Sequence, residues 1–331
     1  MTTYRNTTQA FRALLSKLRA DGANITVRDQ LTLELQSELI EIMNPLERCI
    51  VIPGRGNNIF ATIAETMWVL SGRNDIAYLE GYLKRAGQFS DDGTTWRAGY
   101  GPRLRGWNGA DQLAAVRKIL GDDPNSRRAV ISLYDPDRDI TESKDIPCNN
   151  WLHFMVREGK LHLNVVARST DLIWGFSAIN AFEWSVLQEM MAHWLTVEVG
   201  KFRFFASSLH IYERHYEMLE SIDTSAVRTV YDRPLSPARF ATGWSEFDAT
   251  LGEWMASEAA IRRGEEFALS DAVLRDPLLL QFIQMIDLYW THKRGGRADL
   301  LNDKLSQLAG SDLELAAREY LDRPSNSKIL H

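Results

Sequence analysis

The spacing of apolar residues predicts two buried helices separated by a strand in the first 72 residues. Residues 1–22 have one apolar face at helical spacing, and residues 57–72 mix small and large apolar residues before a glycine stop. Residues 25–35, between them, have the composition and alternation of a strand. The apolar face of the first helix consists of Phe11, Leu14, Leu15 and Leu18.

The middle of the chain predicts helices and strands around a loop of unusual composition. Residues 94–109 are rich in glycine and aromatic side chains and predict a structured loop rather than a regular element. Residues 151–169 alternate on both sides of the polar sequence Arg-Glu-Gly-Lys, which predicts a hairpin. The other elements expected here are helices at 109–126 and 179–196 and strands at 127–136 and 200–212.

From about residue 216 the pattern becomes helical. Residues 244–264 and 276–296 both have helical spacing, and a polar tail follows at 322–331. The predicted fold class is therefore α+β, with a sheet flanked by helices. We expect two parts, a catalytic core over residues 1–220 and a helical C-terminal extension over residues 221–331 that packs on it.

Composition narrows the class of protein. The chain has 331 residues, of which 45% are apolar and 25% charged, as in ordinary globular proteins. Its formal net charge of −6 argues against a nucleic-acid partner. The N-terminal stretch has no apolar signal core, and no run approaches transmembrane length, so we expect a cytoplasmic protein with no membrane partner. Two cysteines make no disulfide framework, which favours a reducing compartment.

Cys148 is the candidate nucleophile because it directly follows a proline and lies among recurring arginines, Arg127, Arg128 and Arg168. The thiolate is the reactive form of cysteine, and cationic neighbours lower the pKa of the thiol. The alternative is a buried, inert cysteine, which is the ordinary fate of this residue type. The sequence around Cys49 gives no sign of reactivity, so we expect Cys49 to be a buried, inert cysteine.

Arginines and a strand pattern also indicate a nucleotide-sized site. Arg127 and Arg128, and separately Arg168, stand at strand ends and offer forked donors suited to a phosphate. Surface salt bridges are the alternative for any one of them. His210 and Tyr212 are two residues apart and therefore share one face of a strand. They are predicted either to bind a sugar hydroxyl or to form an ordinary aromatic pair.

Taken in order, these pieces resemble the thymidylate synthase family over roughly residues 25–216. Each motif is weak alone, but Asp-Pro-x-Ser-Arg-Arg, Pro-Cys, Arg-Ser-x-Asp-x-x-x-Gly and His-x-Tyr are together specific at these separations. The matching segments are VRDQL (27–31), ATIAETMWVLSGRNDIAYL (61–79), YGPRLRGW (100–107), DDPNSRRAVIS (122–132), PCNN (147–150), ARSTDLIWGF (167–176) and SSLHIY (207–212).

The resemblance implies a three-layer α/β sheet sandwich and an obligate homodimer, with Arg127 and Arg128 reaching the partner's phosphate site. It implies that Cys148 adds to carbon 6 of a pyrimidine nucleoside monophosphate, so that carbon 5 can attack 5,10-methylenetetrahydrofolate. Glu65 would act as general acid and base. The other implied roles are catalysis by Tyr100, phosphate binding by Arg28, Arg168 and Ser169, ribose binding by His210 and Tyr212, and placement of base and folate by Asp171. No metal site is expected.

Three departures from the family pattern bear on the substrate and the product. Asn149 follows the cysteine where thymidylate synthases have histidine, and Asn150 stands where phage cytidylate hydroxymethylases also have asparagine. The gapless counterpart of the base-reading asparagine is Ile179, so Asn180 would reach the base only if the chain bulges by one residue. The usual C-terminus that closes over folate has no visible match, and the helical extension replaces it.

These departures favour hydroxymethylation. Reduction of an exocyclic methylene by hydride requires a dry, closed site, whereas addition of water requires a positioned water. We therefore expect a pyrimidine nucleotide 5-hydroxymethylase, and CMP or dCMP is the substrate that we favour. The alternatives are a thymidylate synthase acting on dUMP and a non-catalytic nucleotide-binding or RNA-binding homologue. Retention of both Cys148 and Glu65 argues against the non-catalytic alternative.

Overall fold

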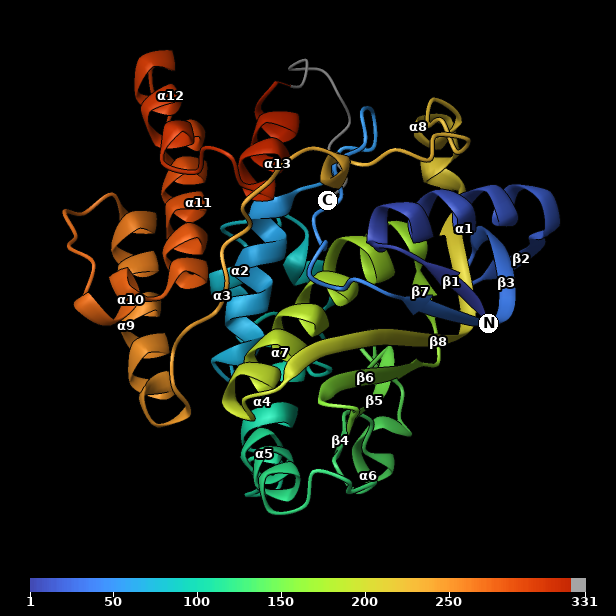
Figure 1. Ribbon diagram of the computed structural model, residues 1–331. Helices are drawn as coiled ribbons and strands as arrows, with labels where there is room; N and C mark the ends of the chain where they lie inside the picture. Colours follow the sequence, from blue (N-terminus) through green and yellow to red (C-terminus); the bar gives the residue numbers. More distant parts are fainter. Residues whose placement is uncertain (323–331) are drawn as a thin grey trace.

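One mixed sheet organises the computed structural model, which describes residues 1–322 (Figure 1). The strand order is β1-β3-β8-β6-β5-β4, with β2 also paired to β3 and β7 to β8. The β1–β3, β6–β8 and β7–β8 pairs are parallel and the others antiparallel. The strands are β1 (Thr2–Tyr4), β2 (Ala23–Val27), β3 (Gln30–Ile42), β4 (Val130–Ser132), β5 (Asn149–Arg157), β6 (Lys160–Ala167), β7 (Thr170–Asp171) and β8 (Glu198–Tyr212).

Two hairpins reverse through residues with positive φ. The turn between β2 and β3 places Arg28 at φ 50° and Asp29 at φ 58°, and the turn between β5 and β6 places Glu158 at φ 53° and Gly159 at φ 71°. Two-residue turns of this kind match the twist of the strands that they join. The prediction of a single strand over residues 25–35 is therefore wrong, because the chain reverses at Arg28 and Asp29 without the Asn-Gly or Asp-Gly pair that usually signals a hairpin.

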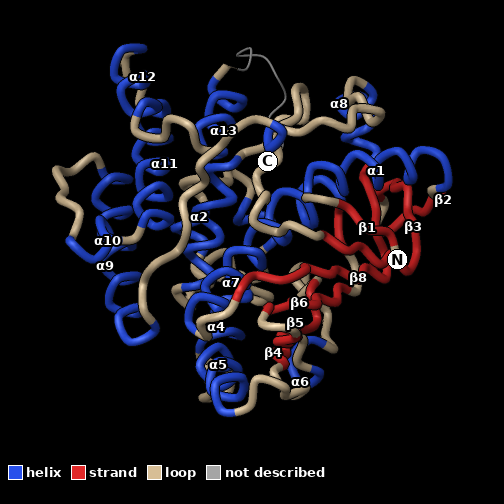
Figure 2. Tube along the Cα trace, in the orientation of Figure 1, coloured by secondary structure: helices blue, strands red, loops and turns tan. Residues whose placement is uncertain are grey.

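Helices cover the sheet and build the rest of the molecule (Figure 2). Helix α1 packs on β3, α5 on β4 and β5, and α7 on β6 and β8. No helix within residues 1–322 is long and apolar enough to span a membrane. The α-helices are α1 (Thr7–Asp21), α2 (Ile59–Leu70), α3 (Ile76–Leu79), α4 (Tyr100–Arg105), α5 (Gln112–Asp122), α6 (Pro136–Asp139), α7 (Ala181–Trp194), α8 (Tyr216–Glu220), α9 (Trp244–Arg263), α10 (Asp271–Arg275), α11 (Pro277–Lys293), α12 (Ala298–Ser306) and α13 (Asp312–Leu321).

Helix α2 lies at the centre of the molecule, and all twelve of its residues are buried. It packs against α7 on the side of the sheet and against α11 and α13 on the other side (Figure 1). An aromatic cluster joins α2 to the C-terminal helices, with the ring of Tyr289 5.3 Å from those of both Phe60 and Tyr82. The layers are therefore the sheet, the α2 and α7 helices, and the helices that follow residue 243.

The α+β fold class is confirmed by this architecture and by the family comparison reported below. The periodic segments also form the predicted elements, including the helices at both ends and the β5–β6 hairpin. The loop predicted over residues 94–109 is partly wrong, because it contains the short helix α4. Six residues between glycines are too few to give a helical period in the sequence. Most of the predicted polar tail, residues 323–331, lies outside the described residues.

Asp276 generates a stability prediction because it anchors the start of α11. Its buried carboxylate accepts from the N–H groups of Leu278 and Leu279, both at 3.0 Å. The other oxygen accepts from the N–H groups of Ala241 and Thr242 at 2.9 and 2.8 Å, and from the Thr242 hydroxyl at 2.6 Å. Asp276→Ala should lower the free energy of unfolding by about 3 kcal/mol or more, measured by chemical denaturation.

The matched control is Asp271→Ala, which removes an exposed carboxylate from the first turn of α10. That change should cost no more than about 0.5 kcal/mol, as is usual for a surface substitution. Equal stabilities for the two variants would contradict the assigned role of Asp276.

Candidate active site

Cys148 immediately precedes β5, and the arginine that follows β6 holds its loop. The guanidinium of Arg168 donates from Nε to the carbonyl oxygen of Pro147 at 2.9 Å and from Nη2 to that of Ile146 at 2.8 Å. The backbone N–H of Arg168 donates to the carbonyl oxygen of Cys148 at 2.9 Å. The same Nη2 lies 4.0 Å from Cys148 Sγ. Arg168 therefore both shapes the loop and faces the thiol.

The two cysteines differ in accessibility, since Cys49 is buried and Cys148 is only partly buried. Desolvation raises the pKa of the Cys148 thiol, and the guanidinium groups of Arg168 and Arg28 oppose that rise. Arg168 therefore lowers the pKa of the thiol as predicted, but desolvation is the larger effect and the net shift is upward. The thiol must lose its proton before it can attack.

A hydrogen-bonded network of amides lies beside the nucleophile. Asn149 donates from Nδ2 to the hydroxyl oxygen of Tyr100 at 2.6 Å and to Oδ1 of Asn180 at 3.0 Å. The indole Nε1 of Trp184 donates to Oδ1 of Asn149 at 3.4 Å. Because an indole N–H can only donate, these contacts decide which way both amides point. Trp184, Asn149 and Asn180 together are called the amide relay below.

Tyr100 completes this network. Its hydroxyl accepts from both the side chain and the backbone N–H of Asn149, the second at 3.1 Å. With two acceptor positions occupied, its own proton is directed to another partner. Burial raises the pKa of Tyr100, so it remains protonated at neutral pH. Tyr100 is thus a neutral hydrogen-bond donor held by the residue next to Cys148.

Asn180 reaches this network through a local change of helix type. It is the last residue of a π-helix, Leu172–Asn180, that leads directly into α7. A π-helical turn holds more residues than an α-helical turn, which supplies the one-residue bulge that the sequence required. Ile179, the gapless counterpart, is buried at 2% exposure in the core. The amide of Asn180 therefore lies beside Asn149, and base reading by Asn180 stays a prediction.

Glu65 is a buried acid on α2. Its Oε2 has no hydrogen-bond partner within the part of the chain that the structure describes. Burial, together with the nearby carboxyl of Asp145, raises the pKa of Glu65 to about 8. Asp145 accepts from the N–H of Ala98 at 2.8 Å, and its burial raises its pKa to about 6. A carboxyl that titrates near neutral pH suits general acid and base chemistry.

The strand pair β7–β8 brings together the predicted ribose-binding residues and the aspartate. Asp171 is in register with His210, and Oδ1 of Asp171 accepts from the N–H of Ile173 at 2.9 Å. The rings of His210 and Tyr212 lie edge to face, with 5.1 Å between centroids. Burial lowers the pKa of His210, while Asp171 and Glu34 oppose that shift. A neutral imidazole beside a phenol can hydrogen-bond a hydroxyl group in either direction.

Arg28 and Arg168 form the positively charged part of this site. Arg28 occupies the turn between β2 and β3, and its charge favours the ionised forms of Cys148 and Tyr212. Ser169 directly follows Arg168 at the end of β6 and is partly exposed. Two guanidinium groups that both act on one thiol create a favourable place for an anion such as a phosphate.

Arg127 and Arg128 do not join this cluster within one chain. They are exposed and precede β4, in which Val130 pairs with His153. If that pairing continues, Arg128 lies opposite the C-terminal half of β5. At the usual rise per residue of a strand, this is about 20 Å from Cys148. A role for these arginines in a partner's site stays a prediction.

Sequence reasoning missed contributions from three residues. Asn149 was noted only as a departure from the family, although its amide joins Tyr100 to Asn180. Trp184 gave no signal beyond an apolar helix face. Asp145 could have been found, because an acid three residues before a candidate nucleophile is an unusual place for a charge.

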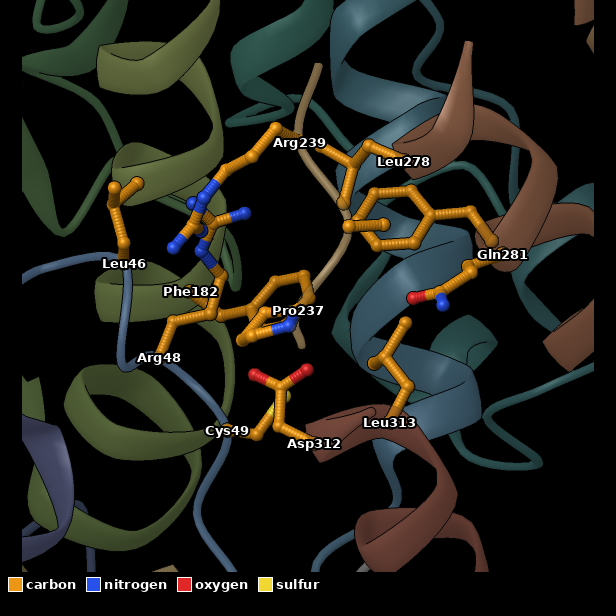
Figure 3. Close-up of a pocket in the computed structure, with 12 residues that line it drawn as sticks. Leu46, Arg48, Cys49, Phe182, Pro237, Arg239, Leu278, Gln281, Asp312 and Leu313 are labelled. Atoms are coloured by element: carbon orange, nitrogen blue, oxygen red, sulfur yellow. The ribbon is translucent and has the colours of Figure 1, made fainter. Parts of the chain in front are cut away.

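The small pocket where the C-terminal helices meet the rest of the molecule is a different site (Figure 3). Its side chains include Arg48, Cys49, Phe182 and Asp312. Its free volume is about 10 Å³, roughly the least that one water molecule requires. None of the predicted site residues lines it, so we do not assign it a substrate.

Residues 15–235 match the sequence model of the family described as thymidylate synthase. With two thirds of its length matched, the chain belongs to the thymidylate synthase family. Enzymes of this family use methylenetetrahydrofolate as the one-carbon donor.

Three phage proteins are similar over most of the chain, and each is named deoxyuridylate hydroxymethyltransferase. The protein from Bacillus phage SP01 is 34% identical, over 85% of this chain and 80% of its own length. The protein from Delftia phage PhiW-14 is 31% identical, over 86% of each chain. The protein from Pseudomonas phage M6 is 30% identical, over 96% of this chain and 93% of its own.

The raised pKa of Glu65 predicts how stability depends on pH. An unfolded glutamate ionises near its usual value of 4.5, whereas folded Glu65 keeps its proton to about pH 8. Between these values the folded state binds more protons, so stability falls as pH rises. Between pH 5 and pH 8, the free energy of unfolding should fall by about 2–4 kcal/mol less in Glu65→Gln than in the wild type. Denaturation curves at both pH values measure this, and parallel curves for the two proteins would contradict it.

Proposed function

We propose that this protein is a deoxyuridylate 5-hydroxymethyltransferase that uses 5,10-methylenetetrahydrofolate and water. The main support is the similarity to three proteins of that name, each covering at least 85% of the chain. The site agrees with such chemistry, because a thiol, two guanidinium groups and two buried acids with raised pKa lie around one set of amides.

In the proposed reaction, Cys148 adds to carbon 6 of the pyrimidine and makes carbon 5 nucleophilic. The donor, when bound, supplies a methylene group to carbon 5. Tyr100 donates a hydrogen bond to the bound reactants. Glu65, which α2 carries, donates and accepts protons. Asp171 retains one carboxylate oxygen beyond its bond to Ile173, and that oxygen fits the N–H donors of a pterin. Arg28, Arg168 and Ser169 bind the phosphate, and His210 and Tyr212 bind the sugar.

The amide relay supports a site that accepts one base and rejects the other. Uracil presents an acceptor at position 4 and a donor at position 3, whereas cytosine presents the reverse. An asparagine that reads one base must rotate its amide to read the other. Rotation of Asn180 would leave the Nδ2 of Asn149 without its acceptor, at a cost of about 1–3 kcal/mol. Asn180 should therefore discriminate strongly, and the named relatives favour uracil over the cytidylate expected from the sequence alone.

Product analysis tests this proposal. With dUMP and methylenetetrahydrofolate, the enzyme should form 5-hydroxymethyl-dUMP and tetrahydrofolate, and oxygen-18 water should label the new hydroxyl group. In tritium release from carbon 5, dUMP should outcompete dCMP. Cys148→Ala should lower turnover at least about 1,000-fold while nucleotide binding survives, and Cys49→Ala should leave turnover intact.

Each other outcome has a definite meaning. Methylated nucleotide with stoichiometric dihydrofolate would refute hydroxymethylation and identify a thymidylate synthase. Preference for dCMP would refute the assignment of the base. Full turnover by Cys148→Ala would refute the nucleophile.

We also propose that the enzyme is a homodimer through the outer face of the sheet. Along β5, the partly exposed Trp151, His153 and Met155 alternate with buried residues. Val130, which pairs with His153 on the neighbouring edge strand β4, is 44% exposed. A two-fold pairing of this face would allow Arg127 and Arg128 to act in the partner's site. The catalytic core is proposed to span residues 1–220 and the extension residues 221–331.

Mixing two inactive variants tests the shared site. Cys148→Ala and the Arg127→Ala/Arg128→Ala double variant should each be inactive, yet together recover about one quarter of the wild-type activity, because half of the dimers are mixed and each has one complete site. No recovery after demonstrated subunit exchange would show that these arginines do not act in the partner's site.

A further inference from the structure

Glu183, on α7, is an acid that the roles above do not use. Its side chain is 1% exposed, and neither carboxylate oxygen has a hydrogen-bond partner within residues 1–322. Burying an unpaired carboxyl group costs several kcal/mol. A residue this costly needs a compensating function or a partner, and no protein group of the described chain provides the partner.

Other buried acids of the chain show what a structural carboxylate looks like here. Glu41 pairs with Lys201 and Arg203, at 3.0 and 2.8 Å. Glu258 accepts from the hydroxyl of Tyr82 at 2.6 Å. In contrast to both, Glu183 stands unpaired at both oxygens. Glu183 therefore resembles a residue that binds a ligand, whereas Glu41 and Glu258 have the partners of structural carboxylates.

The neighbours of Glu183 place it at the site. Helices α2 and α7 pack together, and Glu65 adds to burial in raising the pKa of Glu183 well above its usual range. The charge of Glu183 also acts on Tyr100. Glu183 comes three residues after Asn180 and therefore lies on the same side of the helix. Glu183 is thus near both Glu65 and Tyr100, and it has two unpaired oxygens while Glu65 has one.

Two carboxyl groups in one buried region cannot both ionise easily, and the pKa of each is raised. Unpaired oxygens from both helices provide the two to four polar partners that an ordered water needs. Such a pair can hold a water molecule, and its ionised member can accept a proton.

We propose that Glu183, together with Glu65, holds the water that attacks the exocyclic methylene and takes up the proton of that water. This inference rests on the proposed function. The water oxygen forms a bond to the methylene carbon, and the electrons of the exocyclic double bond move into the enolate of carbon 4. The water proton passes to the carboxyl pair and later to solvent. The enolate then expels the thiolate of Cys148 from carbon 6, which restores the ring double bond.

Competition between water and an added thiol tests this role. The exocyclic methylene accepts 2-mercaptoethanol as well as water, so the ratio of thioether to hydroxymethyl nucleotide measures how well water is positioned. Glu183→Gln keeps the shape but replaces one carboxyl group of the pair by an amide, so the pair should hold the water and take up its proton less well. We expect that ratio to rise at least 10-fold, while tritium release from carbon 5, which precedes the step, changes less than threefold. Glu183→Asp should lie between Glu183→Gln and the wild type.

Glu258→Gln is the matched control, because it alters a buried acid at the contact between α9 and Tyr82. It should leave the product ratio unchanged, whatever it does to stability. An unchanged ratio in Glu183→Gln, or a parallel loss of tritium release, would overturn the inference. Failure of Glu183→Gln to fold would also overturn it, because an unpaired carboxyl has no structural bond to lose. Absence of hydroxymethyl product from the wild type would instead reject the proposed function.

Discussion

The side-chain amide of Asn149 is the contact on which the arrangement of the site depends. It joins the start of β5 to the hydroxyl of Tyr100 on α4, to Asn180 at the start of α7 and to the indole of Trp184. These elements are far apart in sequence, and each supplies one group of the network. Because the amide is completely buried, every bond that it makes would otherwise leave an unsatisfied polar group. The geometry of the amides and that of the loop carrying Cys148 are therefore set together.

Around this contact the protein places its charges unevenly. Positive charge from Arg28 and Arg168 acts on the thiol, whereas the nearby acids Glu65, Asp145 and Glu183 are desolvated. Burial raises the pKa of each of these acids, which lowers stability as pH rises but keeps exchangeable protons near neutral pH. The site thus gives up some stability for proton-transfer capacity. Structural acids such as Glu41 and Asp276 are instead fully hydrogen-bonded.

Much of the fold was predictable because long periodic segments determine it. The first helix, the β5–β6 hairpin and the helices after residue 243 follow from the spacing of apolar residues. The failures are local and have physical causes. Arg28 and Asp29 adopt positive φ without glycine, so the first hairpin was read as one strand. The π-helix adds a residue that no gapless comparison can place, so Asn180 could only be suggested. Glu183 was missed because an acid in an apolar helix has no local signal, and its lack of partners is visible only in three dimensions.

The burial of α2 on every side has a consequence for the evolution of this chain. A helix that is apolar around its whole circumference cannot face water. The helices after residue 243 therefore cover the side of α2 on which α11 and α13 pack, and the chain cannot shed them as it could a tethered accessory module. A chain shortened near residue 220 would expose Phe60 and its apolar neighbours, and would be selected against for insolubility before any loss of chemistry mattered. The matched family segment and the C-terminal helices should thus be inherited, and should unfold, as one cooperative unit.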